Sequence, residues 1–425
     1  MEKFVIQGGK PLSGEIEVRG AKNAAFPVLV ATILTSQDCV IENVPRIEDV
    51  FRMVEILASM GAKVEWMSER TLRVNAKTLN VESLDKDAIL RFRGSVLLLG
   101  ALLARFGTVN LPQPGGDIIG ARPIETHLDA FSQLGVETRR SKNGAGMKVS
   151  SLRSLRETIL NEFSVTATEN VLLFAAKTPG TTLIQIADQD YQVQELIKVL
   201  EKMGASVEPA GPHAYRVRGR KDLGGFKHRL MYDPIEAGTF IVLGAAVQGG
   251  ITVKNVETGF LQLFLKHIRS SGIRLEILKG RNGAEDVKVA GIENFKMEKI
   301  QSMIYPGVSS DLQSVLGVLA TQAKGSTLLH DPLYEGRLKY LEEINKMGAE
   351  IYFTDPHRAI INGPTKLRGT DLGAFDLRGG AAVVIAALIA KGQSTISNIY
   401  QIDRGYERIE ERLQALGADI QRIRV

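Results

Sequence analysis

The sequence predicts an α/β protein with two domains, each built from three copies of one folding unit of about 70 residues. Three observations support this fold class. A short glycine-centred signature recurs six times along the 425 residues. An apolar helix-forming stretch precedes each copy, and strand patterns flank that stretch. Because six units account for the chain, two domains of three units are the simplest division.

The signature itself is an amphipathic helix that stops at a glycine and is followed by a strand, as in SMGAKVE at residues 59–65 and KMGASVE at residues 202–208. The glycines lie 68 to 76 residues apart and are Gly61, Gly135, Gly204, Gly272, Gly348 and Gly417. Such a pattern predicts a glycine C-cap at the end of each helix.

The helix that precedes each signature is apolar on nearly all sides and rich in alanine and glycine, as in SVLLLGALLARFG at residues 95–107. A helix that is apolar all round is buried. No apolar run reaches the roughly 18–20 residues that a membrane span needs. We therefore expect three buried helices packed together in each domain, with sheets and amphipathic helices outside them.

The composition of the chain limits the classes of function that we expect. Hydrophobic residues make up 44% and charged residues 24% of the chain, as in soluble globular proteins. The net charge of +5 is spread along the sequence, so nucleic acid binding is not expected, whereas a small anionic substrate fits. The single cysteine, Cys39, lies in a strand pattern and is predicted to be a small core residue. One cysteine and an N-terminus unlike a secretory signal predict a cytoplasmic protein.

Each buried helix begins with polar residues. Helix N-termini carry free N–H groups and a partial positive charge, so they favour anions. If the units share one orientation, all these N-termini face one cleft. Taken singly, Ser164, Thr166 and Ser309 are more readily simple N-caps than ligands, and Arg93 is as readily a paired or solvated arginine. Asp311 at such a start is a candidate both for a cap and for a general base.

A loop of different character is LPQPGGDIIGARPIETH at residues 111–127. Prolines and paired glycines precede Asp117, and Arg122 follows five residues later. This pattern predicts a mobile loop that carries a carboxylate next to an arginine able to bind an anion.

Four stretches, GAKNAA, GDIIGARPIETH, DLRGG and IDRGYERIEERLQALGA, resemble the UDP-N-acetylglucosamine 1-carboxyvinyltransferase family, and the resemblance runs along the full length. It implies an enolpyruvyl transferase-like, two-domain inside-out α/β barrel. The domains would be residues 22–231 and residues 1–21 with 232–425. The active site would lie in the cleft between them, with residues 111–123 as a lid.

The activity that the resemblance implies is transfer of the enolpyruvyl group of phosphoenolpyruvate to the 3′-hydroxyl of UDP-N-acetylglucosamine, with release of phosphate. This is the first committed step of peptidoglycan precursor synthesis for the cell wall. No metal and no organic cofactor is implied. The expected partners are these two small molecules, without nucleic acid or membrane, and the expected state is a monomer or weak homo-oligomer.

The resemblance also assigns residues. Phosphoenolpyruvate would be bound by Lys22, Arg122, Arg378 and Arg404. The UDP-sugar would be bound by Asn23, Arg93, Arg122, Pro123, Ile124, Glu125, Thr126, Ser164, Val165, Thr166, Asp311 and Leu333. The catalytic set would be Asp117 as proton donor, Asp311 as general base, Lys22 and Arg404. Asp376 and Asp403 are expected to orient the arginines beside them.

Asp117 stands where most of the family has cysteine. The epoxide antibiotic fosfomycin alkylates that cysteine, so the sequence predicts insensitivity to fosfomycin. A closed lid would raise the pKa of Asp117 by desolvation, while Arg122 would oppose this.

Other departures concern the nucleotide side. Thr166 replaces a glycine, Glu162 stands where a lysine is frequent, and residues 188–196 read DQDYQVQEL. His127 is as readily a packing or capping group as a ligand. These departures leave open a paralogue with another acceptor, or one that binds these substrates without catalysis.

Overall fold

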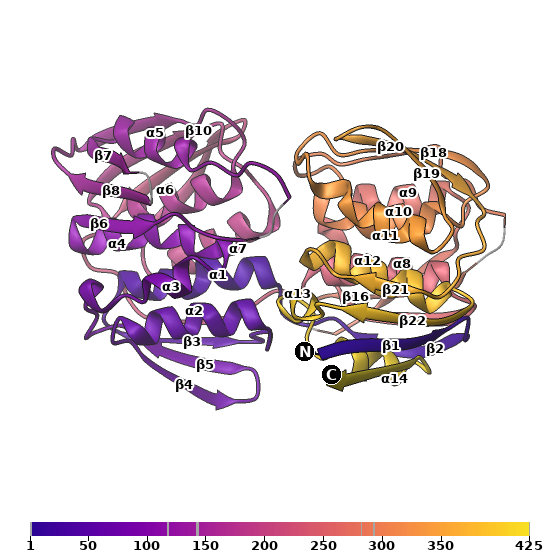
Figure 1. Ribbon diagram of the computed structural model, residues 1–425. Helices are drawn as coiled ribbons and strands as arrows, with labels where there is room; N and C mark the ends of the chain where they lie inside the picture. The colour runs from indigo at the N-terminus through magenta and orange to yellow at the C-terminus, as the bar shows by residue number, and fades with distance from the viewer. Residues whose placement is uncertain (1, 117–118, 142–143, 282, 292–293, 425) are drawn as a thin grey trace. The chain divides into compact units, whose positions relative to one another are not determined.

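The computed structural model describes residues 2–116, 119–141, 144–281, 283–291 and 294–424 (Figure 1). The chain divides into two compact units. Unit 1 comprises Met1–Arg19, Ile118–Ala121 and Tyr232–Val425, and unit 2 comprises Gly20–Asp117 and Arg122–Met231. Both units contain helices and strands in a mixed α/β arrangement, as the repeated pattern predicts.

The described elements of unit 2 are α1 (Lys22–Ala31), η1 (Thr32–Leu34), β3 (Asp38–Glu42), α2 (Glu48–Ser59), β4 (Lys63–Ser68), β5 (Thr71–Asn75), η2 (Val81–Ser83), α3 (Lys86–Ile89), η3 (Arg93–Leu97), α4 (Leu98–Phe106), β6 (Thr108–Pro112), α5 (Glu125–Gln133), β7 (Val136–Ser141), β8 (Gly144–Val149), β9 (Leu155–Ile159), α6 (Val165–Lys177), β10 (Gly180–Gln185), α7 (Tyr191–Lys202), β11 (Ser206–Gly211), β12 (Ala214–Gly219) and β13 (Phe226–Arg229).

Those of unit 1 are β1 (Glu2–Gly8), β2 (Leu12–Glu17), α8 (Pro234–Ala246), β14 (Gly249–Val256), η4 (Thr258–Phe260), α9 (Gln262–Ser270), β15 (Leu275–Lys279), β16 (Glu285–Val289), β17 (Lys299–Gln301), α10 (Ser310–Ala320), β18 (Gly325–His330), η5 (Arg337–Lys339), α11 (Tyr340–Lys346), β19 (Glu350–Asp355), β20 (Arg358–Gly363), β21 (Asp371–Gly373), α12 (Leu377–Ile389), β22 (Gly392–Ser397), α13 (Tyr400–Asp403), α14 (Ile409–Gln414) and β23 (Asp419–Arg424).

The sheets repeat one strand order. In the sheet β9-β10-β12-β11, the edge strand β9 runs parallel to β10, and the other neighbours are antiparallel. Four more sheets have the same order: β13-β3-β5-β4, β2-β14-β16-β15, β17-β18-β20-β19 and β21-β22-β1-β23. The remaining sheet, β6-β8-β7, has three strands among the described residues. The repeats in sequence are therefore repeats in structure.

Strands distant in sequence complete three of these sheets. β2 precedes α1 in the chain, but it pairs with β14 of unit 1. β13 precedes α8, but it pairs with β3 of unit 2. β1 at the N-terminus lies between β22 and β23, so the first residues of the chain complete the last repeat.

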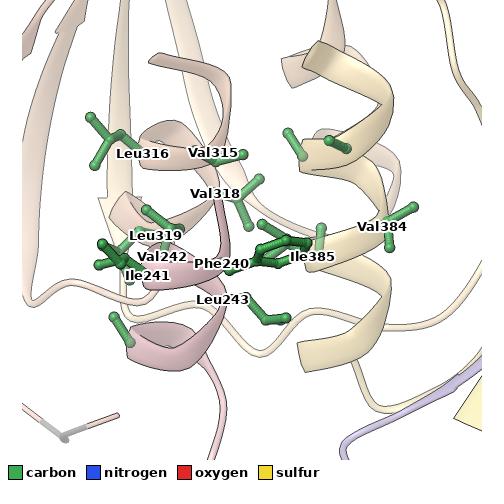
Figure 2. Close-up of a cluster of buried hydrophobic side chains, with 14 of the residues drawn as sticks. Phe240, Ile241, Val242, Leu243, Val315, Leu316, Val318, Leu319, Val384 and Ile385 are labelled. Carbon is green, nitrogen blue, oxygen red and sulfur yellow. The ribbon is translucent and has the colours of Figure 1, made fainter. Parts of the chain in front are cut away.

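The apolar helices form the core of each unit. In unit 1, α8, α10 and α12 pack against one another, and Figure 2 shows Phe240, Leu319 and Ile385 among the side chains that fill the space between them. In unit 2, α4 packs against α6, whereas α1 packs mainly against α7, an amphipathic helix of the signature, so the expected group of three apolar helices is seen in unit 1. Burying one such side chain stabilises the fold by roughly 1.5–3 kcal/mol. None of the described helices is both long and apolar enough to cross a bilayer.

The glycines of the signature end their helices as predicted. All six adopt positive φ, between 89° at Gly135 and 102° at Gly204. In the first copy, the Gly61 N–H donates to the Ala58 carbonyl at 2.8 Å, and the Ala62 N–H donates to the Leu57 carbonyl at 3.1 Å. Because an L-residue with a side chain is strained in this region, glycine turns the chain from helix to strand.

A buried acid in unit 2 leads to a stability prediction. Glu169 on α6 is 1% exposed, and its Oε1 has no hydrogen-bond partner among the described residues. Burial raises the pKa of Glu169 well above its ordinary value, and Asp188 and Asp190 raise it further. The unfolded chain therefore releases this proton at lower pH than the folded chain, and the free energy of unfolding falls as the pH rises.

We expect Glu169→Gln to raise the Tm by at least about 2 °C near pH 7.5. The gain should shrink as the pH falls below the ordinary value of 4.5, because both states then hold the proton. Differential scanning calorimetry of both proteins across this pH range measures the difference in Tm.

Glu195→Gln is the matched control of opposite sign. Burial alone would raise the pKa of Glu195, but the hydrogen bond and charge of His228 outweigh it and lower that pKa. This substitution should therefore lower the Tm at neutral pH. Shifts of the same sign in both variants near neutrality would contradict the assignment.

Candidate active site

The carboxylate of Asp311 in unit 1 is held by two guanidinium groups. Ser309 is the N-cap of α10, and its hydroxyl accepts the Asp311 N–H at 3.2 Å. Arg337 Nη2 donates to Asp311 Oδ1 at 2.9 Å, and Arg378 Nε donates to Oδ2 at 3.0 Å. The Asp311 side chain is 24% exposed, whereas both arginine side chains are 3% exposed. Asp311 therefore presents its carboxylate at the surface of the unit, with buried cations behind it.

Arg337 was not singled out from the sequence. It lies in η5, and its Nε donates to the Ser310 hydroxyl at 3.0 Å. Burial alone would lower the pKa of Arg337, but the carboxylates of Asp311 and Asp376 raise it above its ordinary value. Nothing in the local sequence YEGRLKY distinguishes this arginine from a solvated one, so only the tertiary contacts reveal it.

Arg378 is placed by the start of α12. Asp376 is the N-cap, and its Oδ1 accepts the N–H groups of Arg378 and Gly379, each at 3.0 Å. The Arg378 Nη1 donates to the Tyr406 hydroxyl at 3.4 Å, and Tyr406 also bonds Thr239 on α8 at 2.9 Å. Tyr406 thus links the N-terminal turns of α8 and α12, and Asp376 orients Arg378 through the backbone.

The segment that carries Arg404 packs closely on α12 because both sides have glycine. A Cβ on Gly405 would lie 2.7 Å from Leu377, and one on Gly380 would lie 2.8 Å from Ile402. Arg404 is buried, and its Nη1 donates to the Gln401 side-chain oxygen at 2.8 Å. The glycines of DLRGG and IDRGY therefore bring Arg404 beside the start of α12.

Asp403 does not play the role expected for it. Its two oxygens accept from Arg422 on β23, at 2.6 and 2.9 Å. Hydrogen bonding to Asp403, Glu410 and Glu2 outweighs burial and raises the pKa of Arg422. The carboxylate beside Arg404 in sequence thus anchors the C-terminal strand, because the side chains of adjacent helical residues point in different directions.

Two further segments belong to unit 1. Leu333 is 39% exposed, and its N–H donates to buried Asp331 at 3.0 Å. Ile119 is buried, and its carbonyl accepts the Gly336 N–H at 2.9 Å. Asp117 lies outside the described residues, so its surroundings and its pKa stay matters of prediction.

In unit 2, Lys22 and Asn23 begin α1 without a side-chain N-cap. Lys22 is buried, forms an ion pair with buried Asp49 at 3.0 Å and lies over the Phe26 ring. The Asn23 amide donates to the Tyr191 hydroxyl at 3.2 Å. A buried lysine that is paired in this way is held in one position, which suits a cation that contacts substrate.

The start of α5 meets the starts of η3 and α6 in the same unit. Arg93 Nη2 donates to the Pro123 carbonyl at 3.0 Å. The Thr126 hydroxyl donates to Glu162 Oε1 at 3.0 Å, and His127 Nε2 lies 3.2 Å from the Thr166 hydroxyl. We name these six residues the α5–α6 cluster.

The rest of the predicted nucleotide wall lies along the same elements. Ser164 is the N-cap of α6, with its hydroxyl accepting the Ala167 N–H, and Val165 is the first residue of that helix. Ile124 precedes α5 and is buried, Glu125 pairs with Arg140, and Arg122 is half-buried. Thr166 is not a cap.

The structure offers neither an exposed cysteine nor a metal site among the described residues. The only cysteine, Cys39, is buried in β3 as predicted, and burial raises the pKa of its thiol to about 12. In the part of the chain that the structure describes, no three His, Cys, Asp or Glu side chains gather closely enough to hold a metal ion.

Comparison with known proteins supplies the remaining evidence. The model of the family described as EPSP synthase (3-phosphoshikimate 1-carboxyvinyltransferase) matches residues 6–413. A UDP-N-acetylglucosamine 1-carboxyvinyltransferase from Treponema denticola is 36% identical over 424 residues, covering 99% of both chains. The protein of that name from Bradyrhizobium diazoefficiens is 39% identical over 436 residues, covering 99% of this chain and 98% of the relative.

Solved structures agree in fold. The enolpyruvyl transferase NikO from Streptomyces tendae superposes with a TM-score of 0.89 at 27% identity, covering 99% of each chain. An EPSP synthase from Acinetobacter baumannii gives a TM-score of 0.77 at 17% identity, covering 100% of each chain, which shows a shared fold alone.

Proposed function

We propose that this chain, which belongs to the UDP-N-acetylglucosamine 1-carboxyvinyltransferase family, transfers the enolpyruvyl group of phosphoenolpyruvate to the 3′-hydroxyl of UDP-N-acetylglucosamine and releases phosphate. The observation that carries the proposal is full-length similarity to relatives of that name, at 36% and 39% identity. The reaction needs no metal or organic cofactor. It serves peptidoglycan precursor synthesis, and we place the enzyme in the cytoplasm as a monomer or weak oligomer.

In this proposal the cations bind phosphoenolpyruvate. They are Lys22, Arg122, Arg378 and Arg404. A guanidinium can bind a carboxylate or a phosphate through two parallel hydrogen bonds. Burial of Lys22, Arg378 and Arg404 supports the proposal, because a buried cation gains much from an anionic ligand.

Asp311 and Asp117 share the proton transfers. Asp311 accepts the proton of the sugar hydroxyl, whose oxygen then bonds to the phosphate-bearing carbon of phosphoenolpyruvate. Asp117 gives a proton to the methylene carbon. The Asp117 carboxylate then takes a proton back from that carbon, and departure of phosphate restores the double bond. The two arginines on Asp311 support its part, because they hold its carboxylate in one orientation.

The UDP-sugar would be bound by Asn23, Arg93, residues 122–126, residues 164–166, Asp311 and Leu333. A carboxylate in the α5–α6 cluster favours a second candidate. Glu162 accepts from Thr126, so a negative charge stands in the predicted nucleotide wall, where it would repel a diphosphate. The second candidate is an enolpyruvyl transferase of this family with a less anionic acceptor.

Phosphate release tests both candidates. The purified protein is given phosphoenolpyruvate with UDP-N-acetylglucosamine, and phosphate and the enolpyruvyl product are measured. Turnover at a rate of at least about 1 per second is expected. Turnover only with an uncharged or monophosphorylated sugar nucleoside would favour the second candidate. Binding of both substrates without any product would show a non-catalytic relative.

A further inference from the structure

A chain of hydrogen bonds begins inside the η3–α4 helix of unit 2. In an uninterrupted α-helix, the Gly100 N–H would donate to the Val96 carbonyl. Here the side chain of Asn170 lies between them. The Gly100 N–H donates to Asn170 Oδ1 at 2.7 Å, and Asn170 Nδ2 donates to the Val96 carbonyl at 3.0 Å. A Cβ on Gly100 would lie 2.1 Å from the Asn170 carbonyl, so glycine permits this close approach.

These two bonds fix which way the Asn170 amide faces. A backbone N–H can only donate and a backbone carbonyl can only accept, so the oxygen and nitrogen of the amide cannot be exchanged. The second hydrogen on Asn170 Nδ2 then meets His127 Nδ1 at 3.0 Å. His127 Nδ1 must accept, and the proton of the neutral ring resides on Nε2.

The ring of His127 stays neutral at physiological pH. Burial, together with the smaller effect of the Arg93 charge, lowers the pKa of His127 to about 3. With the proton on Nε2, the ring donates to the Thr166 hydroxyl at 3.2 Å. Thr166 Oγ1 is therefore an acceptor in this bond, and its own hydrogen is available to another acceptor.

Among the described residues, the Thr166 hydroxyl has no second hydrogen bond, and its side chain is half-buried. The contrast with Thr168 on the same helix is informative. The Thr168 hydroxyl donates to the Ser164 carbonyl at 2.8 Å, the usual bond of a helical threonine. Thr166 is the second residue of α6, so the carbonyl four residues before it, that of Glu162, precedes the N-cap Ser164, and no such bond is found among the described residues.

We propose that His127 is a positioning residue: its ring holds the Thr166 oxygen, so that the Thr166 hydroxyl donates its hydrogen to an oxygen of the nucleotide part of the acceptor substrate. The inference rests on the proposed function and adds to it a residue that decides specificity. The oxygen belongs either to a phosphate or to the uridine part, since both carry hydrogen-bond acceptors.

Three variants test the proposal. Thr166→Val keeps the shape and removes the hydroxyl, Thr166→Ser keeps the hydroxyl, and His127→Asn keeps an acceptor near the Nδ1 position without reaching Thr166. Thr78→Val is the matched control, because Thr78 is exposed and bonds only the Gly61 carbonyl among the described residues.

Thr166→Val should weaken UDP-N-acetylglucosamine binding in calorimetry about tenfold, and raise its KM equally, with the KM for phosphoenolpyruvate unchanged. Thr166→Ser and Thr78→Val should bind as the wild type does. His127→Asn should weaken binding in the wild-type background and add little to Thr166→Val, because it acts through Thr166.

The probes UDP and uridine identify the oxygen. A loss confined to UDP assigns a phosphate oxygen, and an equal loss for uridine assigns an oxygen of the uridine part. Unchanged affinity of Thr166→Val for UDP-N-acetylglucosamine, UDP and uridine would overturn the proposal. So would an equal loss for phosphoenolpyruvate, since that indicates general disruption.

A readout independent of catalysis separates this proposal from the proposed function. ¹⁵N NMR of the His127 ring should show the proton on Nε2 between about pH 6 and 8. The opposite tautomer would overturn the proposal even in an active enzyme. If the protein binds the nucleotide but releases no phosphate, the proposed function is contradicted. The binding measurements on the Thr166 variants still decide the proposal about Thr166.

Discussion

Asp311→Asn is expected to lower kcat by about 100- to 10,000-fold, because a carboxamide cannot accept the proton of the sugar hydroxyl. The amide has nearly the shape of the carboxylate, and its oxygen can still accept from one of the two arginines. The KM for phosphoenolpyruvate should therefore change little. Steady-state phosphate release, with each substrate varied in turn, measures the separation of kcat from KM.

The same substitution also leaves buried Arg337 with less compensating charge, so some loss of stability is expected. Asp286→Asn provides the control for that effect. Asp286 is a buried aspartate of β16 in the same unit, and it pairs with Lys254 at 2.6 Å. The Asp286→Asn variant should lose stability and keep the kcat of the wild type. A kcat of Asp311→Asn near that of Asp286→Asn would exclude a general base at Asp311.

Fosfomycin should not inactivate the wild-type protein covalently, and Asp117→Cys should become sensitive. Thiolates open epoxides, and the only cysteine of the chain is Cys39. Its burial and its pKa of about 12 keep it a neutral, inaccessible thiol. Mass spectrometry after incubation should therefore show one adduct in Asp117→Cys and none in the wild type.

Asp117→Asn completes this series. An amide cannot give a proton to the methylene carbon, so kcat should fall by at least about 100-fold, whereas Asp117→Cys should retain turnover. A covalent adduct on wild-type protein would show that Asp117 does not occupy the position of the family's thiol. Full activity of Asp117→Asn would remove Asp117 from the proton transfer.

Part of the candidate site follows from local sequence alone. Ser164, Ser309 and Asp376 are N-caps, and each precedes an apolar helix in the sequence. Local sequence does not decide which charged groups meet. Asp403 binds Arg422 on a distant strand, although Arg404 is its neighbour in the chain. Arg337 reaches Asp311 from an unremarkable helix start later in the same repeat, and Arg378 reaches it from the next repeat.

The sequence by itself determined the repeat, the helix ends at six glycines and the buried character of the central helices, because periodicity, φ preference and apolar composition act within a few residues of one another. It also contained the motifs by which the chain is assigned to its family. Only the tertiary structure decided that β1 completes the last repeat, that Asp403 serves Arg422, and that Asn170 fixes the tautomer of His127. Each of these depends on a contact between segments far apart in the chain, where hydrogen-bond direction and burial are set by packing.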